Sequence, residues 1–179
     1  MAEIVSGNEL RCLIIGCGAI GVRHLKNLLA LNVGKIIAFD TSEKCCQAIR
    51  SQFSIEVANN LDDAWACHPD VVFITVPTYL HIPLCLEAVQ RGCHVFIEKP
   101  ISHSVQSADS LLSAAEENDV FIQVGHIERF NPAVARVKEY LKSRQYGELI
   151  RLEFYREHRM PAHIKDCLLY TSPSPRDRG

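Results

Sequence analysis

The fold of this chain is decided by the stretch Leu13-Ile14-Ile15-Gly16-Cys17-Gly18-Ala19-Ile20-Gly21. An apolar run followed at once by the pattern G-x-G-x-x-G predicts a buried strand that turns directly into a helix. The helix is indicated by apolar residues at helical spacing, which are Val22, Leu25, Leu28 and Leu29, and by the end signals Asn32 and Gly34. Glycine permits the tight turn and the close approach of a phosphate. The free N–H groups and the positive dipole end of this helix therefore predict a pyrophosphate site.

Asp40 directly follows the next predicted strand, residues 35–39, and lies 19 residues past Gly21. A carboxylate at this distance can accept hydrogen bonds from the hydroxyls of an adenosine ribose. Its charge would repel the additional phosphate of NADP, so the sequence favours NAD, while Lys44 leaves a dual preference open. Alternatively, Asp40 is a turn residue or caps the helix that begins near Glu43.

Strands alternate with helices along the chain as far as residue 126. The further expected strands are residues 35–39, 55–57, 71–76, 94–97 and 120–124, and the further expected helices are residues 43–52, 61–67, 82–91 and 105–115. This order predicts an α/β fold over residues 1–126. It is a doubly wound parallel sheet of the Rossmann type, with the strand order 3-2-1-4-5-6 and right-handed crossovers.

Five residues with special or polar character stand at the ends of five different predicted strands, and they are Gly16, Asp40, Thr75, Glu98 and His126. Doubly wound sheets bind their ligands along the edge where the carboxyl ends of the strands lie. We therefore expect these residues to share one site. Loops are polar in any case, which weakens the argument from their positions alone.

A second structural region is predicted beyond the sheet. Asn131 and Pro132 are suited to the cap and first turn of a helix, whose buried face would carry Val134, Val137 and Leu141. Residues 149–155 alternate apolar and polar side chains, as a half-exposed strand does. We expect residues 127–166 to form a connecting helix and the beginning of an α+β substrate domain.

Composition excludes several classes of function. A net charge of −2 and a pI near 6.4 give no general attraction to nucleic acid or anionic lipid. The apolar runs have the length of strands, and no signal peptide or membrane span is visible, so the sequence favours a cytoplasmic protein.

The eight cysteines contain no C-x-x-C pair, and four of them fall within strand, loop or helix patterns, namely Cys12, Cys17, Cys85 and Cys93. We expect reduced and mostly buried thiols. Cys17 is a separate case, because a thiol near a helix start can have a lowered pKa. His158 and His163 do not have the spacing of a helical metal pair, so we expect no metal site.

Two further motifs carry a family resemblance: Thr75-Val76-Pro77-Thr78 followed by His81, and Glu98-Lys99-Pro100. With the glycine loop, they make residues 11–166 resemble the Gfo/Idh/MocA oxidoreductases. Within that family, residues 124–132, Val-Gly-His-Ile-Glu-Arg-Phe-Asn-Pro, are most similar to the UDP-N-acetylglucosamine 3-dehydrogenase branch, which oxidises the 3-hydroxyl of the sugar using NAD.

The resemblance implies cofactor-binding roles for residues 16–21 at the pyrophosphate and for Asp40 at the adenosine ribose. The residues it places toward the nicotinamide are Thr75, Pro77, His81 and, at the nicotinamide ribose, Glu98. It also implies that Lys99 reaches the substrate and assists proton transfer. A lysine acts as a base near neutral pH only when its pKa is lowered, which partial burial and the positive nicotinamide ring would do.

Plainer interpretations exist for several of these residues. Lys99 could be a solvated lysine in a turn, and His81 could cap or cover the following helix. His126 and Arg129 could be residues at the start of a helix, although an arginine beside the cleft suits a diphosphate substrate. The family's further histidine in the substrate domain has no counterpart in this sequence.

We therefore expect an NAD-dependent dehydrogenase that oxidises a secondary hydroxyl of a sugar nucleotide, UDP-N-acetylglucosamine or its uronic acid, at C3. The alternatives are a dehydrogenase of inositol, another polyol or a free sugar, and a non-catalytic dinucleotide-binding module. The family commonly forms homo-oligomers, and we expect one for the full-length protein.

The last residues have a different composition. Residues 167–177 resemble the translation of a transposase adapter used in sequencing libraries, so we expect a non-native tail over residues 167–179. If natural sequence ends near Asp166, the substrate domain is incomplete, and we expect weak activity or none for this polypeptide.

Overall fold

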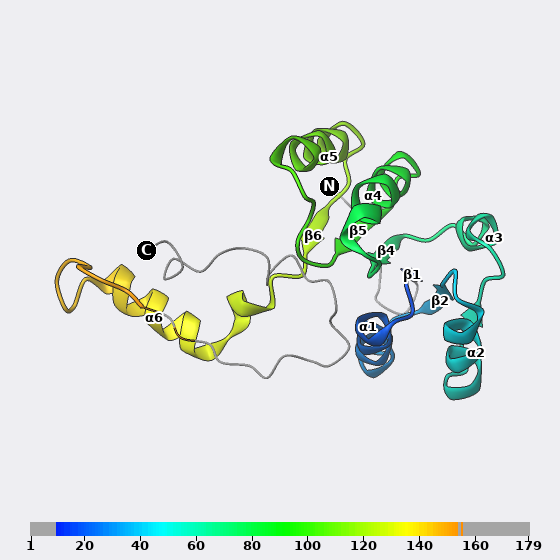
Figure 1. The fold of residues 1–179 in the computed structure, drawn as a ribbon, viewed down its shortest axis with the longest axis horizontal. Coiled ribbons are helices and arrows are strands. Elements are labelled where there is room, and N and C mark those ends of the chain that lie inside the picture. Colours follow the sequence, from blue (N-terminus) through cyan, green and yellow to red (C-terminus); the bar gives the residue numbers. More distant parts are fainter. Residues whose placement is uncertain (1–9, 154, 156–179) are drawn as a thin grey trace, which may run out of the picture. The chain divides into compact units, whose positions relative to one another are not determined.

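A computed structural model describes residues 10–153 and 155 of the 179-residue chain. The chain divides into two compact units, Met1–Phe130 and Asn131–Gly179, and each is described by itself. The first unit is built on one sheet of six parallel strands (Figure 1).

The strands of this sheet are β1 (Arg11–Ile15), β2 (Lys35–Phe39), β3 (Glu56–Val57), β4 (Val71–Ile74), β5 (His94–Ile97) and β6 (Ile122–Val124). They lie in the order β3-β2-β1-β4-β5-β6, which confirms the predicted doubly wound topology. β4 ends two residues earlier than predicted, at Ile74. Thr75 still donates its N–H to the carbonyl of Ile15, but its side chain turns to the glycine loop and the chain leaves the sheet there.

The helices of the first unit are α1 (Ala19–Ala30), α2 (Glu43–Gln52), α3 (Leu61–Ala66), α4 (His81–Gln90) and α5 (Val105–Glu117), with short 3-10 turns at Thr78–Leu80 and Ile127–Phe130. Helices cover both faces of the sheet (Figure 1). Because each strand alternates its side chains between the two faces, β1 contributes to two separate cores. Leu13 and Ile15 pack with residues of α3, α4 and α5, whereas Cys12 and Ile14 pack with residues of α1 and α2.

The glycine loop is held by a very close approach of backbone to backbone. A β-carbon built onto Gly21 would lie 1.9 Å from the carbonyl oxygen of Gly16, and one on Gly16 would lie 2.7 Å from the carbonyl oxygen of Thr75. Gly16 also has a φ of +98°, a backbone conformation that residues other than glycine rarely adopt. A β-carbon on Gly18, in contrast, would meet nothing within 4 Å among the described residues.

The second unit contains α6 (Pro132–Ser143), which begins as predicted, with the Asn131 side chain accepting a hydrogen bond from the N–H of Ala133. Two expectations for this unit are wrong. None of the described residues of α6 is buried, and Val134, Val137 and Leu141 are half-buried or exposed, because no described element covers that face. Residues 149–153 and 155 form no strand, since no described strand pairs with their backbone groups.

Other expectations fall on residues outside the described part of the chain. They concern the absence of a metal site at His158 and His163 and the non-native tail over residues 167–179. These stay predictions, as does the assignment of residues 127–166 to a substrate domain.

The glycine loop gives a first test, in which Gly21→Ala is compared with Gly18→Ala. Because the β-carbon at Gly21 collides with backbone, we expect Gly21→Ala to lower the free energy of unfolding by about 3 kcal/mol or more. Gly18→Ala should change it by less than about 1 kcal/mol. Urea unfolding followed by the fluorescence of Trp65, the single and buried tryptophan, measures both. Equal losses in the two variants would contradict this account of the loop.

Candidate functional site

The predicted site residues of the first unit do lie along the carboxyl edge of the sheet. Gly16, Asp40, Thr75 and Glu98 directly follow β1, β2, β4 and β5, and His126 lies two residues past the end of β6. Backbone hydrogen bonds continue the ladder at this edge, from the N–H of Gly16 to Phe39, of Glu98 to Ile74 and of Gly125 to Ile97. The pairing of neighbouring strands therefore sets the positions of these residues relative to one another along the sheet edge.

The N-terminus of α1 is open toward this edge. Gly18 is its N-cap residue, with no side-chain cap, and the first turn of the helix contains no acidic side chain. Gly18, Ala19 and Ile20 are exposed, although Gly16 and Cys17 behind them are buried. Free N–H groups and the helix dipole favour an anion here, and the missing β-carbon at Gly18 leaves room for one. The loop residues present thus fit a pyrophosphate.

Asp40 connects the glycine loop to the start of α2. Its Oδ2 accepts a hydrogen bond of 2.6 Å from the backbone N–H of Cys17, and its Oδ1 accepts one of 2.7 Å from the N–H of Ser42, the N-cap residue of α2. The alternative of a turn residue thus describes part of what Asp40 does. Each carboxylate oxygen has a further lone pair for another donor, so the turn role and a ribose contact are compatible.

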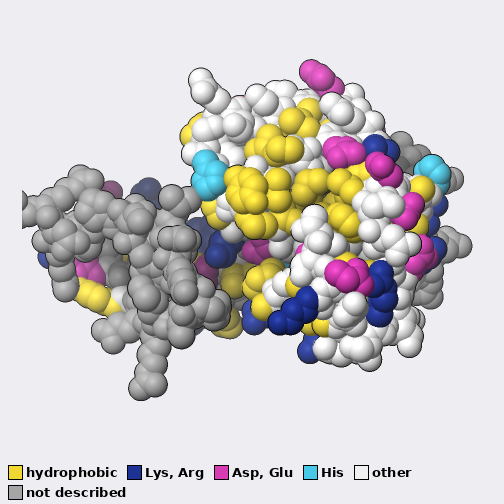
Figure 2. Space-filling view, turned by 45° about the vertical axis from the view of Figure 1, so that its right-hand side comes forward, with side chains coloured by type: hydrophobic (Ala, Val, Ile, Leu, Met, Phe, Trp, Pro, Cys, Tyr) yellow, Lys and Arg dark blue, Asp and Glu magenta, His cyan; other side chains and the backbone are white. Residues whose placement is uncertain are grey.

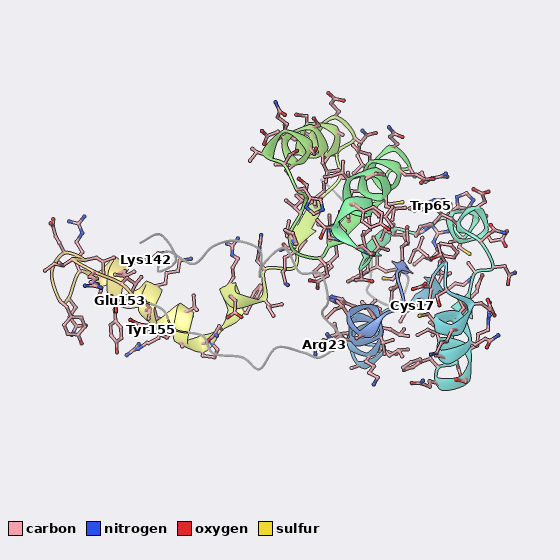
Figure 3. The ribbon with its side chains drawn as sticks, viewed as in Figure 1. Cys17, Arg23, Trp65, Lys142, Glu153 and Tyr155 are labelled. Carbon is pink, nitrogen blue, oxygen red and sulfur yellow. The ribbon has the colours of Figure 1, made fainter. Side chains whose placement is uncertain are left out.

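The expectation of a lowered pKa at Cys17 is wrong. The Cys17 side chain is 5% exposed, and its Sγ lies 3.5 Å from the carbonyl oxygen of Phe39, to which it donates (Figure 3). Burial, and then the nearby Asp40 carboxylate, raise the pKa of the Cys17 thiol to about 12. Desolvation of the thiolate outweighs the helix dipole because the thiol lies under the loop, away from the exposed helix start. The expected reduced and buried thiols at Cys12, Cys85 and Cys93 are confirmed.

Thr75 and His81 hold loops together. The Thr75 hydroxyl donates to the carbonyl of Gly16 at 2.6 Å, which fixes the glycine loop against the end of β4. His81 is 1% exposed, and its two ring nitrogens lie 2.9 Å from the carbonyl oxygens of Val76 and Pro100. It therefore links the loop after β4 to the loop after β5 and is not presented at the surface of the site. Pro77, between them in sequence, is exposed.

His24 is a residue of this site that the sequence analysis missed. Its Nε2 lies 2.9 Å from Oε1 of Glu98, and both side chains are largely buried. A signal was present in the sequence, because a histidine interrupts the apolar side of α1 between Gly21 and Leu28. A polar side chain on a buried helix face needs a partner.

Lys99, His126 and Arg129 are all exposed. The partial burial expected for Lys99 is not provided by the described residues. Lys99 is placed by its neighbours, since its backbone N–H donates to Oε2 of Glu98 at 3.3 Å and it precedes Pro100 through a cis peptide bond. His126 follows β6, and Arg129 lies in the adjoining 3-10 turn. Their side chains are exposed among the described residues, as suits contact with a ligand at the surface.

A cavity of about 740 Å³ lies elsewhere, at the amino ends of β1, β4 and β5. Its lining includes Arg11 and Asp70, which form an ion pair of 3.3 Å. Trp65, which is labelled in Figure 3, lines it as well. None of the predicted site residues lines it. The polar residues that fit a dinucleotide are at the opposite edge of the sheet, so we place the candidate site there.

A profile of one oxidoreductase family, described as having an NAD-binding Rossmann fold, matches residues 10–126. The chain belongs to the Gfo/Idh/MocA family of oxidoreductases. The expectations of this family, of an NAD-binding Rossmann fold and of NAD as cofactor are thereby confirmed.

Similar proteins include two kinds of dehydrogenase. The scyllo-inositol 2-dehydrogenase (NAD(+)) of Bacillus subtilis is 27% identical over 154 residues, which are 80% of this chain and 43% of that protein. The UDP-N-acetylglucosamine 3-dehydrogenase of Acidithiobacillus ferrooxidans is 28% identical over 139 residues, or 78% of this chain and 42% of that protein. The two relatives have nearly the same identity to this chain, so they support one family and do not distinguish between their two substrates.

Among solved structures, the WlbA dehydrogenase from Bordetella pertussis, in complex with NADH and UDP-GlcNAcA, matches with a TM-score of 0.73. It is 23% identical, and the match covers 80% of this chain and 42% of that chain, so the likeness shows a common fold. The chain spans about two fifths of the length of the relatives it matches.

The surface carries no single dominant charge on the face shown in Figure 2, where acidic and basic side chains lie around a hydrophobic area. Within residues 10–153, no helix combines the length and hydrophobicity needed to cross a bilayer.

The raised pKa of Cys17 gives a second test. At pH 8 a thiol with a pKa of about 12 is ionised about 1,000-fold less than one at the usual 9.0, so we expect iodoacetamide to leave Cys17 unmodified in the folded chain. Reactivity should rise with pH toward 12, and the same peptide should react readily in urea. Peptide mass mapping measures this, and rapid labelling of folded Cys17 at neutral pH would contradict the assignment.

Proposed function

We propose that the protein is an NAD-dependent dehydrogenase that oxidises a secondary hydroxyl of a sugar nucleotide, UDP-N-acetylglucosamine or its uronic acid, at C3. The observation that carries the proposal is the placement of Glu98 and Lys99 at the end of β5, on the same sheet edge as the open glycine loop. A cofactor lying across that edge would bring its nicotinamide end to these two residues. The similar UDP-N-acetylglucosamine 3-dehydrogenase supports the choice of substrate.

The residues of this chain would hold the cofactor as follows. The loop of residues 16–21 binds the pyrophosphate through backbone N–H groups, and Asp40 accepts hydrogen bonds from the adenosine ribose. Glu98 accepts hydrogen bonds from the nicotinamide ribose. Thr75 and Pro77 line the region toward the nicotinamide, and His81 contributes by linking the loops that carry Val76 and Pro100.

Bound NAD would accept the hydride that leaves the carbon bearing the hydroxyl. The hydroxyl proton must leave together with that hydride, and we assign its removal to the Lys99 amine. Because Lys99 is exposed in this structure, desolvation around its amine has to come from the bound substrate and cofactor. His126 and Arg129, also exposed, are suited to bind the substrate, Arg129 by paired hydrogen bonds to a diphosphate.

A second candidate is an inositol or other polyol dehydrogenase, which the similar scyllo-inositol 2-dehydrogenase favours. Both candidates use the same hydride and proton transfers and differ in whether a diphosphate is bound. A non-catalytic dinucleotide-binding module would need the loop and Asp40 but no lysine at position 99, so the presence of Lys99 favours an enzyme. A homo-oligomer and a cytoplasmic location stay predictions.

A substrate panel tests the proposal in a protein extended to the full length of the relatives it matches. UDP-N-acetylglucosamine, its uronic acid and inositol are each mixed with NAD, and formation of NADH is followed by absorbance. We expect turnover with a UDP-sugar. Turnover of inositol alone would establish the second candidate, and NAD binding without reduction by any of the three would favour the non-catalytic module.

Lys99→Ala in the same full-length protein tests the proton transfer. Loss of a positioned base should lower turnover by about 10²- to 10⁴-fold, while the affinity for NADH changes by less than about twofold. Lys26→Ala, at another exposed lysine in α1, is the matched control and should retain full turnover. Unaltered turnover in Lys99→Ala would remove this residue from the mechanism.

A further inference from the structure

We propose that His24 is a positioning residue, which holds the Glu98 carboxylate in the orientation that receives the nicotinamide ribose. The proposal rests on the function proposed above and assigns a role to a residue outside the motifs that led to it. His24 lies one turn after the glycine loop in α1, and Glu98 follows β5, 74 residues further along the chain.

The contact between the two side chains is short and shielded. His24 Nε2 lies 2.9 Å from Glu98 Oε1, and the side chains are only 15% and 17% exposed. An ionised carboxylate can only accept hydrogen bonds, so the Nε2–H of His24 donates. Hydrogen bonds to a charged group in a shielded position are stronger than those between neutral groups at a surface.

The His24 ring is itself held by two aromatic side chains from the sheet. Its centroid lies 4.8 Å from that of Phe96 and 5.8 Å from that of Phe73. Phe73 and Phe96 are register partners on β4 and β5, and their rings stack at 5.2 Å. Because the sheet fixes both phenylalanines, the direction in which Nε2 points is fixed too.

The Glu98 carboxylate is restrained from other sides as well. Its Oε2 accepts the backbone N–H of Lys99 at 3.3 Å. On the β6 side Gly125 leaves it more space than another residue would, since a β-carbon there would lie 3.1 Å from Oε1, a tighter contact than usual. The hydrogen bonds from His24 and from the Lys99 N–H use two of about four lone-pair positions on the carboxylate. The carboxylate therefore retains the capacity to accept hydrogen bonds from ribose hydroxyls.

One helix therefore would set two parts of the bound dinucleotide, the central pyrophosphate and the nicotinamide ribose. The N-terminus of α1 meets the pyrophosphate, and His24 in its next turn orients the group for the nicotinamide ribose. A change at His24 that leaves the helix in place should weaken only the second of these contacts. This selectivity distinguishes a positioning role from a general contribution of His24 to packing.

The experiment uses the chain as it exists, with His24→Leu and three ligands: NADH, ADP-ribose and ADP. NADH and ADP-ribose carry the second ribose, whereas ADP ends at the pyrophosphate. We expect His24→Leu to weaken NADH and ADP-ribose by about 10-fold or more and ADP by less than about twofold. Fluorescence titration measures NADH, and calorimetry measures the other two ligands.

Two further variants separate hydrogen bonding from packing. His24→Gln restores an N–H donor on a side chain of suitable length and should recover most of the NADH affinity. Lys26→Leu, at an exposed position of the same helix, is the matched control and should bind all three ligands as the unaltered chain does. Equal weakening of ADP and NADH by His24→Leu, or no weakening of either, would overturn the proposal.

If His24→Leu does not fold, as judged by urea unfolding, Gly125→Ala replaces it. Its β-carbon would press on Glu98 at 3.1 Å and on Phe96, a ring neighbour of His24, at 3.2 Å, so it disturbs the same contact without changing the His24 side chain. Selective loss of NADH and ADP-ribose would support the positioning of Glu98, and unselective behaviour would overturn it. An unaltered chain that binds no NADH would instead refute the proposed function, and the role of His24 with it.

Discussion

The site depends on the close packing of the glycine loop against the end of β4. Gly21 approaches the carbonyl of Gly16 at a distance that no β-carbon would allow, and the Thr75 hydroxyl donates a hydrogen bond to the same carbonyl. This packing brings the N-terminus of α1 down onto the sheet edge. The placement of α1 also sets the positions of the glycine loop and of His24, because the loop leads into this helix and His24 lies within it.

The loops around the site are joined by polar contacts, most of which are partly buried. Asp40 links the glycine loop to α2, and His81 links the loops after β4 and β5. The His24–Glu98 pair links α1 to β5. Such contacts are directional, so they fix where each loop stands as well as how firmly it is held.

Much of the first unit could be predicted from sequence because its signals are local. Strands buried on both faces are continuous apolar runs, and glycine at residues 16 and 21 marks backbone contacts that exclude side chains. The predictions that were wrong concern the burial of a residue or its pairing with another segment. The dipole at the start of α1 suggested a lowered pKa at Cys17, but the depth of its thiol under the loop raises it. The alternation in residues 149–155 suggested a strand, yet a strand requires a partner to pair with.

The sequence by itself determined the order of strands and helices, the glycine loop and the positions of Asp40, Glu98 and Lys99 at strand ends. These follow from the spacing of residues along one chain, which the covalent backbone carries into the fold. Only the tertiary structure decided that His24 meets Glu98, that His81 is buried between two carbonyl groups and that Lys99 stands exposed. Burial and pairing of this kind depend on segments far apart in sequence, and those segments become neighbours only when the sheet brings its strand ends together.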